Sequence, residues 1–143
     1  MIKVLAVSAP KQFWRLQKKI PELLTRLLSL PKLALVNVVF LSAAKAQKFN
    51  WQLRRRRYVP DVLSLNFNTY RSIGVKSALP LLGELYLCWP QIQKQARLNG
   101  KKSEQELAWV LIHGLLHLLG YDHEQSRPAL AMRALEQKIL TQF

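Results

Sequence analysis

The stretch Ser103-Glu-Gln-Glu-Leu-Ala-Trp-Val-Leu-Ile-His113-Gly-Leu-Leu-His117-Leu-Leu-Gly120 carries the clearest structural signal in the chain. Ser103, with Glu106 three residues later, forms a capping-box pattern, which predicts a helix from Ser103 to about Leu119. Gly120 stands where a residue of left-handed conformation commonly ends a helix. We therefore expect one helix to carry the first two histidines.

The segments on either side of this helix predict a sheet. Four apolar segments are expected to be strands: Met1–Ala9, Leu33–Leu41, Asp61–Phe67 and Leu81–Trp89. Further helices are expected at Glu22–Leu30 (with Pro21 at its first position), Ala43–Leu53, Gln91–Leu98 and after Pro128. Asn68–Leu79 is expected to be a loop. Because strands and helices are intermixed, we expect a single α/β (α+β) domain over residues 1–143, with helices packed on a roughly four-stranded mixed sheet.

The charge balance indicates a polyanionic partner. Among 143 residues, 22 are Lys or Arg and 8 are Asp or Glu, which gives a net charge of +14. Nucleic acid is the first class of partner to consider and an anionic membrane the second. The alternative is a basic protein that has no such partner. No apolar run approaches the ~20 residues that cross a bilayer, so no membrane-spanning segment is expected. Of the two polyanions we expect nucleic acid, and not a membrane, to be the partner.

Cys88 is the only cysteine, so no disulfide-linked partner is expected and a reducing cytoplasm fits best. No small-residue cleavage site follows the apolar N-terminal residues, which disfavours a signal peptide. Cys88 lies in the apolar segment Leu85–Trp89. A buried structural thiol is therefore favoured there over a catalytic thiolate.

All three histidines of the protein lie close together in sequence, at His113, His117 and His123. Residues four apart on a helix share a face, at about 5–6 Å between Cβ atoms, so His113 and His117 can bind one metal ion. A left-handed turn at Gly120 would return the chain so that His123 supplies a third ligand. The alternative is that the histidines are separate core or capping residues.

Three protein ligands leave one position of a tetrahedral zinc ion open for water, as in catalytic sites, whereas structural zinc has four protein ligands. A structural site would need Asp or Glu as the fourth ligand here. Metal-bound water is a nucleophile at neutral pH, so the pattern predicts a hydrolase. Three imidazoles also suit nickel and other transition metals.

The same histidine spacing occurs in metzincin peptidases, which carry a glutamate general base directly after the first histidine. That position is Gly114 here, which cannot transfer a proton. Peptide hydrolysis is therefore the weaker hypothesis. Asp122 and Glu124 flank His123, and either is a candidate for orienting the water or a ligand imidazole.

The basic composition favours a phosphodiester substrate. The run Arg54-Arg55-Arg56-Arg57 is a candidate RNA-binding segment, since guanidinium groups match phosphate oxygens. The alternative is that each arginine is a solvent-exposed charge that binds no RNA. Trp51 and Tyr58 beside the run are candidates for stacking on bases of single-stranded RNA, although such aromatic residues more often pack against the protein.

These residues resemble a known family, the YbeY-type endoribonucleases, also called ribosomal RNA maturation factors. The segment from His113 to His123 is similar to their His-Gly-x-Leu-His-Leu-x-Gly-Tyr-Asp-His signature at every fixed position. Further resemblance lies in Asp61-Val-Leu-Ser64, in Leu82-Gly-Glu-Leu85, and around Met132 and Glu136 to Leu140, so that it extends from about residue 34 to the end. Pro60, Leu65-Asn66 and Glu84 depart from the family's usual residues.

The resemblance implies an α/β domain with a zincin-like metal-binding helix and zinc-dependent cleavage of single-stranded RNA. It also implies a role in ribosomal RNA maturation and quality control, with ribosomal RNA and the small subunit as partners. The family carries a functional arginine seven residues before the Asp of Asp-Val-Leu-Ser, which is Arg54 here. The expected catalytic set is thus Arg54, His113, His117 and His123. A metallopeptidase and a non-catalytic, metal-stabilised ribosome-assembly factor are the alternatives.

Overall fold

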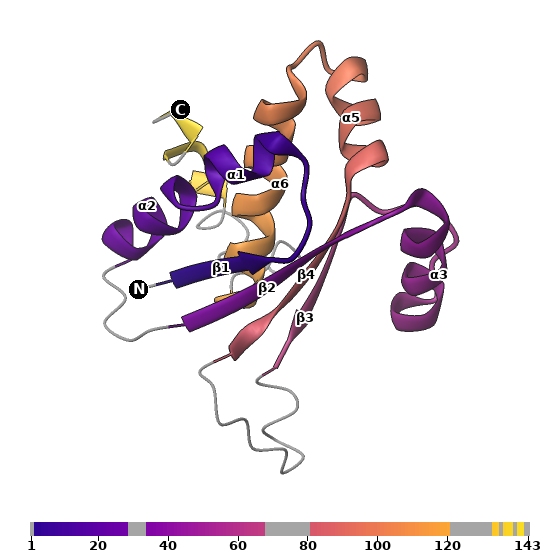
Figure 1. Cartoon of the computed structure of the whole chain (residues 1–143), viewed down its shortest axis with the longest axis horizontal. Helices are drawn as coiled ribbons and strands as arrows, with labels where there is room; N and C mark the ends of the chain where they lie inside the picture. The colour runs from indigo at the N-terminus through magenta and orange to yellow at the C-terminus, as the bar shows by residue number, and fades with distance from the viewer. Residues whose placement is uncertain are drawn as a thin grey trace.

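Four strands form a mixed sheet in the computed structural model, in the order β1-β2-β4-β3 (Figure 1). The structure describes residues 2–28, 34–67 and 81–120 and, near the C-terminus, 133, 134, 136–138, 140 and 141. The strands are β1 (Ile2–Ala6), β2 (Ala34–Leu41), β3 (Val62–Asn66) and β4 (Leu81–Cys88). β1, β2 and β4 are parallel, and β3 runs antiparallel to β4. The predicted four-stranded mixed sheet is confirmed.

The described residues near the C-terminus are largely helical, as predicted after Pro128, and five further helices are described from end to end. They are α1 (Lys11–Leu16), α2 (Lys19–Leu27), α3 (Ala43–Arg54), α5 (Trp89–Leu98) and α6 (Ser103–Leu118). Buried side chains of α1, α2, α5 and α6 form one core with the inward residues of the sheet, such as Val36 and Leu85. α3 packs on the other face, where the Phe49 and Tyr86 rings meet edge to face at 5.5 Å, and it also contacts α5 (Figure 1).

α6 lies at the centre of the core, in contact with β3, β4, α1, α2 and α5. Leu107, Leu111 and Leu115 are fully buried, and each such side chain contributes roughly 1.5–3 kcal/mol through burial. A helix that is apolar on nearly all sides is typical of such a buried position. Gly120 has a φ of 99°, and its N–H donates to the carbonyl of His117 at 3.0 Å, so the predicted left-handed helix end is confirmed.

Gly114 allows α6 to approach the sheet closely. A Cβ atom at this position would lie 2.9 Å from Cδ2 of Leu85 and 3.4 Å from Cγ2 of Val62. Since Leu85 is fully buried, it has little room to move aside. The glycine therefore sets the distance between the histidine helix and strands β3 and β4.

Several predicted details are wrong. Ser103 is the first residue of α6 rather than its cap; the Gln105 side chain accepts from the N–H of Lys102, and Glu106 is buried. α2 begins at Lys19, two residues before Pro21, whose missing N–H is tolerated in the first turn. α1 was not predicted.

The strand predicted over Met1–Ala9 ends at Ala6, and α5 begins at Trp89, two residues before the predicted start. The predicted loop Asn68–Leu79 lies outside the described residues, as does the beginning of the helix predicted after Pro128. Of the helices that are described, none has the length and apolarity needed to cross a membrane.

Candidate active site

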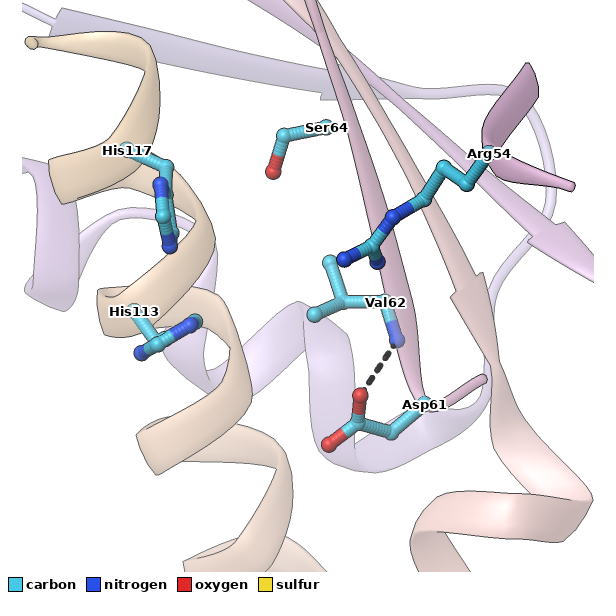
Figure 2. Close-up of a pocket in the computed structure, with 6 residues that line it drawn as sticks. All are labelled: Arg54, Asp61, Val62, Ser64, His113 and His117. Carbon is cyan, nitrogen blue, oxygen red and sulfur yellow. Dashed lines mark hydrogen bonds between the residues drawn. The ribbon is translucent and has the colours of Figure 1, made fainter. Parts of the chain in front are cut away.

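His113 and His117 lie one turn apart on α6 and line a pocket of about 260 Å³ (Figure 2). Their ring centroids are 4.7 Å apart, with an angle of 68° between the ring planes. The structure thus confirms that the two imidazoles share one face of the helix. They are near enough to each other to approach a common ion.

His113 is held by two further side chains. Its ring stacks on Trp109, with the centroids 5.1 Å apart, and its Nδ1 lies 2.9 Å from Oε1 of Glu136. The Glu136 side chain is only 5% exposed. An ionised carboxylate can only accept a hydrogen bond, so it favours the tautomer with the proton on Nδ1 and the lone pair on Nε2.

The opposite wall of the pocket comes from α3 and β3. Arg54, the last residue of α3, extends its guanidinium group across the pocket toward the histidine side (Figure 2). Val62 and Ser64 reach the pocket because alternate residues of β3 face α6. The Oδ1 atom of Asp61 accepts a hydrogen bond from the Val62 N–H at 2.7 Å, which fixes the carboxylate at the pocket rim.

The arginine run is divided between two places. Arg54 lines the pocket, whereas the guanidinium carbons of Arg55 and Arg57 lie 5.3 and 5.2 Å from the centroid of the Trp51 ring. Arg56 is exposed. Of the four arginines, Arg54 is therefore the one that the structure places with the histidine pair.

His123, Asp122 and Glu124 lie outside the described residues. Within the described ranges, no three side chains of the metal-binding types come together. The donors that are described nevertheless suit a metal ion: two imidazoles share a helix face, and one of them has its Nδ1 engaged by a buried carboxylate. This is the usual environment of a ligand histidine.

The sequence did not assign site roles to Asp61, Ser64 or Glu136. Ser64 gave no distinct signal, because a polar residue that alternates with apolar ones and is exposed on its strand is common in any sheet. Glu136 gave none, since its contact with His113 spans 23 residues and has no spacing rule. Cys88 is buried as expected, and this burial raises the pKa of its thiol, which disfavours a reactive thiolate.

Comparisons with known proteins give consistent matches in sequence and in fold. The sequence model of the family "Endoribonuclease YbeY" matches residues 6–143, and so includes N-terminal residues that the resemblance from residue 34 did not cover. The endoribonuclease YbeY of Alkalilimnicola ehrlichii is 41% identical over 97 residues, which are 68% of this chain and 57% of that protein. The endoribonuclease YbeY of Ureaplasma parvum is 34% identical over 126 residues, 88% of this chain and 78% of that protein.

Among solved structures, the solution structure of TM1509 from Thermotoga maritima is similar, with a TM-score of 0.64 and 28% sequence identity. The match covers 98% of this chain and 87% of that one. The family model and the shared fold extend over nearly the whole chain, including the histidine helix and the strand opposite it. The chain therefore belongs to the endoribonuclease YbeY family.

Proposed function

We propose that this protein is a zinc-dependent endoribonuclease that cleaves single-stranded RNA in ribosomal RNA maturation and ribosome quality control. The observation that carries the proposal is the pocket in which His113 and His117 face the guanidinium group of Arg54. Family membership supports an endoribonuclease role in ribosomal RNA processing. A reducing cytoplasm suits the single buried cysteine.

His113 and His117 would hold the zinc ion, with His123 as the third ligand, so that α6 acts as a zincin-like metal-binding helix. When bound, zinc would supply Lewis-acid polarisation of a phosphoryl oxygen and a nucleophile at neutral pH. Glu136 supports this assignment because a carboxylate at Nδ1 favours the tautomer whose Nε2 carries the lone pair that a metal ion needs. Nickel also suits such a ligand set.

Arg54 would bind the scissile phosphate. A guanidinium group donates two parallel hydrogen bonds to phosphate oxygens and stays charged at any physiological pH. Its place opposite the histidine pair would hold the phosphate between the cation and the metal ligands and would stabilise negative charge that develops on the phosphate during cleavage. Asp61 at the rim, with Asp122 and Glu124, forms the set of candidate proton acceptors.

The packing of Gly114 argues against the peptidase alternative. The base of a metzincin stands directly after the first histidine, and here a side chain at that position would collide with Leu85. Position 114 therefore carries no general base, and the packing against Leu85 leaves no space for a side chain that could act as one. RNA is the substrate that both the pocket and the charge of +14 favour.

Cleavage of a defined ribosomal RNA fragment by purified protein of known metal content tests the proposal. We expect about one zinc ion per chain, loss of cleavage on chelation, recovery on adding zinc, and no cleavage by His117→Ala with its fold retained. Casein should remain intact. Full RNA cleavage by a metal-free preparation would contradict the proposal, and RNA binding without any turnover would favour the assembly-factor alternative.

Arg54→Ala and Arg56→Ala form a matched pair, since both remove one cation from the same run. Loss of a group that stabilises developing charge typically costs roughly 100-fold in rate. We expect a loss of this order in kcat/KM for Arg54→Ala and little change for Arg56→Ala. Equal effects of the two substitutions would show that Arg54 contributes only to the overall positive charge.

A further inference from the structure

The outer surface of α3 carries a second cluster that the proposed active site does not use. Trp51 is 40% exposed, and the guanidinium groups of Arg55 and Arg57 lie over its ring, 5.3 and 5.2 Å from the ring centroid. Trp51 and Arg57 line a hollow of about 400 Å³ with Ala44, Gln47 and Lys48. Residues 43–58 contain six Lys or Arg and no acidic residue, so the charge of this surface is not balanced locally.

Hydrogen bonds hold the chain after α3 back against the helix. The Gln47 side-chain amide donates to the carbonyl of Arg57 at 2.7 Å, and the amide of the fully buried Asn50 donates to the carbonyl of Tyr58 at 2.9 Å. These bonds return Arg57 to the level of Trp51, one turn above the helix end. The cluster is therefore fixed by the backbone and does not depend only on flexible side chains.

Arg55 has a φ of 56° and is the one non-glycine residue with positive φ in the part of the chain that the structure describes. This conformation costs roughly 1–2 kcal/mol for a residue with a Cβ atom, and glycine would avoid the cost. An arginine at a position that glycine would occupy without this cost makes the Arg55 side chain a candidate for a functional role.

We propose that Trp51, Lys48, Arg55 and Arg57, here called the Trp51 site, form a second nucleotide-binding site that takes one base of single-stranded RNA and its flanking phosphates. Bases stack on guanidinium planes as well as on indole rings, so a base can continue the stack that Arg55 and Arg57 form over Trp51. This stacking does not require a particular sequence. In a duplex the bases are paired and stacked on one another, so the site selects single strands.

The Trp51 site would act together with the active site. Arg54 faces the histidine pocket and Arg57 faces Trp51, and three residues of chain separate their Cα atoms by at most about 11 Å. One RNA strand that passes the end of α3 can therefore contact both. The inference rests on the proposed RNA substrate, and it adds that the strand beyond the cleaved bond is held by stacking.

Binding of a non-cleavable 2′-O-methyl oligouridine, followed by fluorescence anisotropy, tests the site without turnover. Trp51→Ala is expected to weaken binding roughly tenfold, as for loss of one base stack, with the salt dependence unchanged. Trp14→Ala is the matched control, because Trp14 is 45% exposed on α1, and it should bind as the wild type does. A duplex RNA should bind both variants equally well.

Arg55→Gly separates binding from folding. It relieves the positive-φ cost, so the variant should melt at a higher temperature, yet it should bind the oligouridine more weakly, with a salt slope shallower by about 0.7 for the lost phosphate contact. A weaker RNA complex from a more stable protein cannot result from misfolding.

Four results would overturn the inference: unchanged oligouridine binding by Trp51→Ala, an equal loss in Trp14→Ala, an equal loss for duplex RNA, or a Trp51-dependence seen only with phosphatidylglycerol vesicles. The binding assay also separates this inference from the proposed function. If the wild-type protein cleaves RNA and Trp51→Ala binds the oligouridine normally, only the Trp51 site is refuted. If binding depends on Trp51 but the wild-type protein cleaves no RNA, the proposed enzymatic function is refuted and the Trp51 site stands.

Discussion

The imidazole of His113 can coordinate a metal ion through either nitrogen, and its contact with Glu136 favours one of them. Because Nδ1 lies 2.9 Å from the buried carboxylate, Nε2 is the nitrogen that would coordinate a metal ion. A glutamine at position 136 can donate as well as accept, so it no longer selects one tautomer. Glu136 therefore positions His113 and does not itself need to touch the substrate.

Glu136→Gln is accordingly expected to lower zinc affinity by about 10- to 100-fold, measured by competition with a chromophoric chelator. In the metal-free protein, nitrogen NMR of His113 should show a smaller share of the Nδ1-protonated tautomer. Gln137→Ala, at the exposed neighbouring residue, is the control. Wild-type zinc affinity and an unchanged tautomer in Glu136→Gln would refute the positioning role.

Glu106, in the first turn of α6, gives a prediction for pH. Its side chain is buried, and the desolvation raises the pKa of the carboxyl above the ordinary value of 4.5. Between 4.5 and the raised value the folded state binds more protons than the unfolded chain, so stability falls as pH rises through this interval. Glu106→Gln should lessen that fall and should be the more stable protein at pH above the interval. Urea unfolding of the wild type and of Glu106→Gln across this pH range measures the two free energies of unfolding. Parallel curves of this free energy against pH would exclude a contribution from Glu106.

At the scale of the element, α6 is positioned by the contact between Gly114 and Leu85. Alanine at position 114 gains about 1 kcal/mol in helix propensity, but overpacking of a core typically costs 1–3 kcal/mol. We expect Gly114→Ala to be destabilised overall by about 1 kcal/mol in chemical denaturation. In the background of Leu85→Ala, which makes space at the contact, the same substitution should be stabilising. Additive effects of the two substitutions would show that the Cβ contact does not limit the approach of the helix.

Some helices and strands could be predicted from their local sequence, and others could not. β2, β4 and α6 were predicted because continuous apolar runs with clear ends leave few alternatives. α1 was missed because its six residues show less than two turns of periodicity, and its Phe13 becomes a core residue only through contacts with distant elements. The cap of α6 was misplaced because Ser103 and Glu106 fit the capping pattern locally, whereas packing buries Glu106.

At the scale of the whole molecule, one part of the site follows from helix spacing in the sequence, and the other part depends on the tertiary fold. The spacing on one helix was enough to pair His113 with His117, since it depends only on helix geometry. That Arg54, and not Arg55 or Arg57, faces this pair depends on where α3 ends and how the following residues turn back, which local sequence does not determine. Contacts between distant segments, such as that of Glu136 with His113, required the structure.

The net charge of +14 acts on folding and on binding in opposite directions. Self-repulsion among the cations destabilises the free folded protein, and salt screens it, with a Debye length of about 10 Å at 0.1 M and 3 Å at 1 M. Raising the salt from about 0.1 to 1 M should therefore raise the melting temperature of the free protein by several degrees. The same salt should weaken the RNA complex steeply, because each phosphate contact releases a bound counterion.

Thermal unfolding with and without single-stranded oligouridine, at both salt concentrations, measures the two effects in one experiment. At low salt and 100 times the dissociation constant, the RNA should add about 2.7 kcal/mol to the stability of the folded protein, and at high salt this gain should disappear. Sodium chloride and potassium chloride should act alike, since screening depends on ionic strength and not on the cation. If the free protein were instead destabilised by salt, attraction within ion pairs would outweigh the repulsion among its excess cations, and the expected self-repulsion would be refuted.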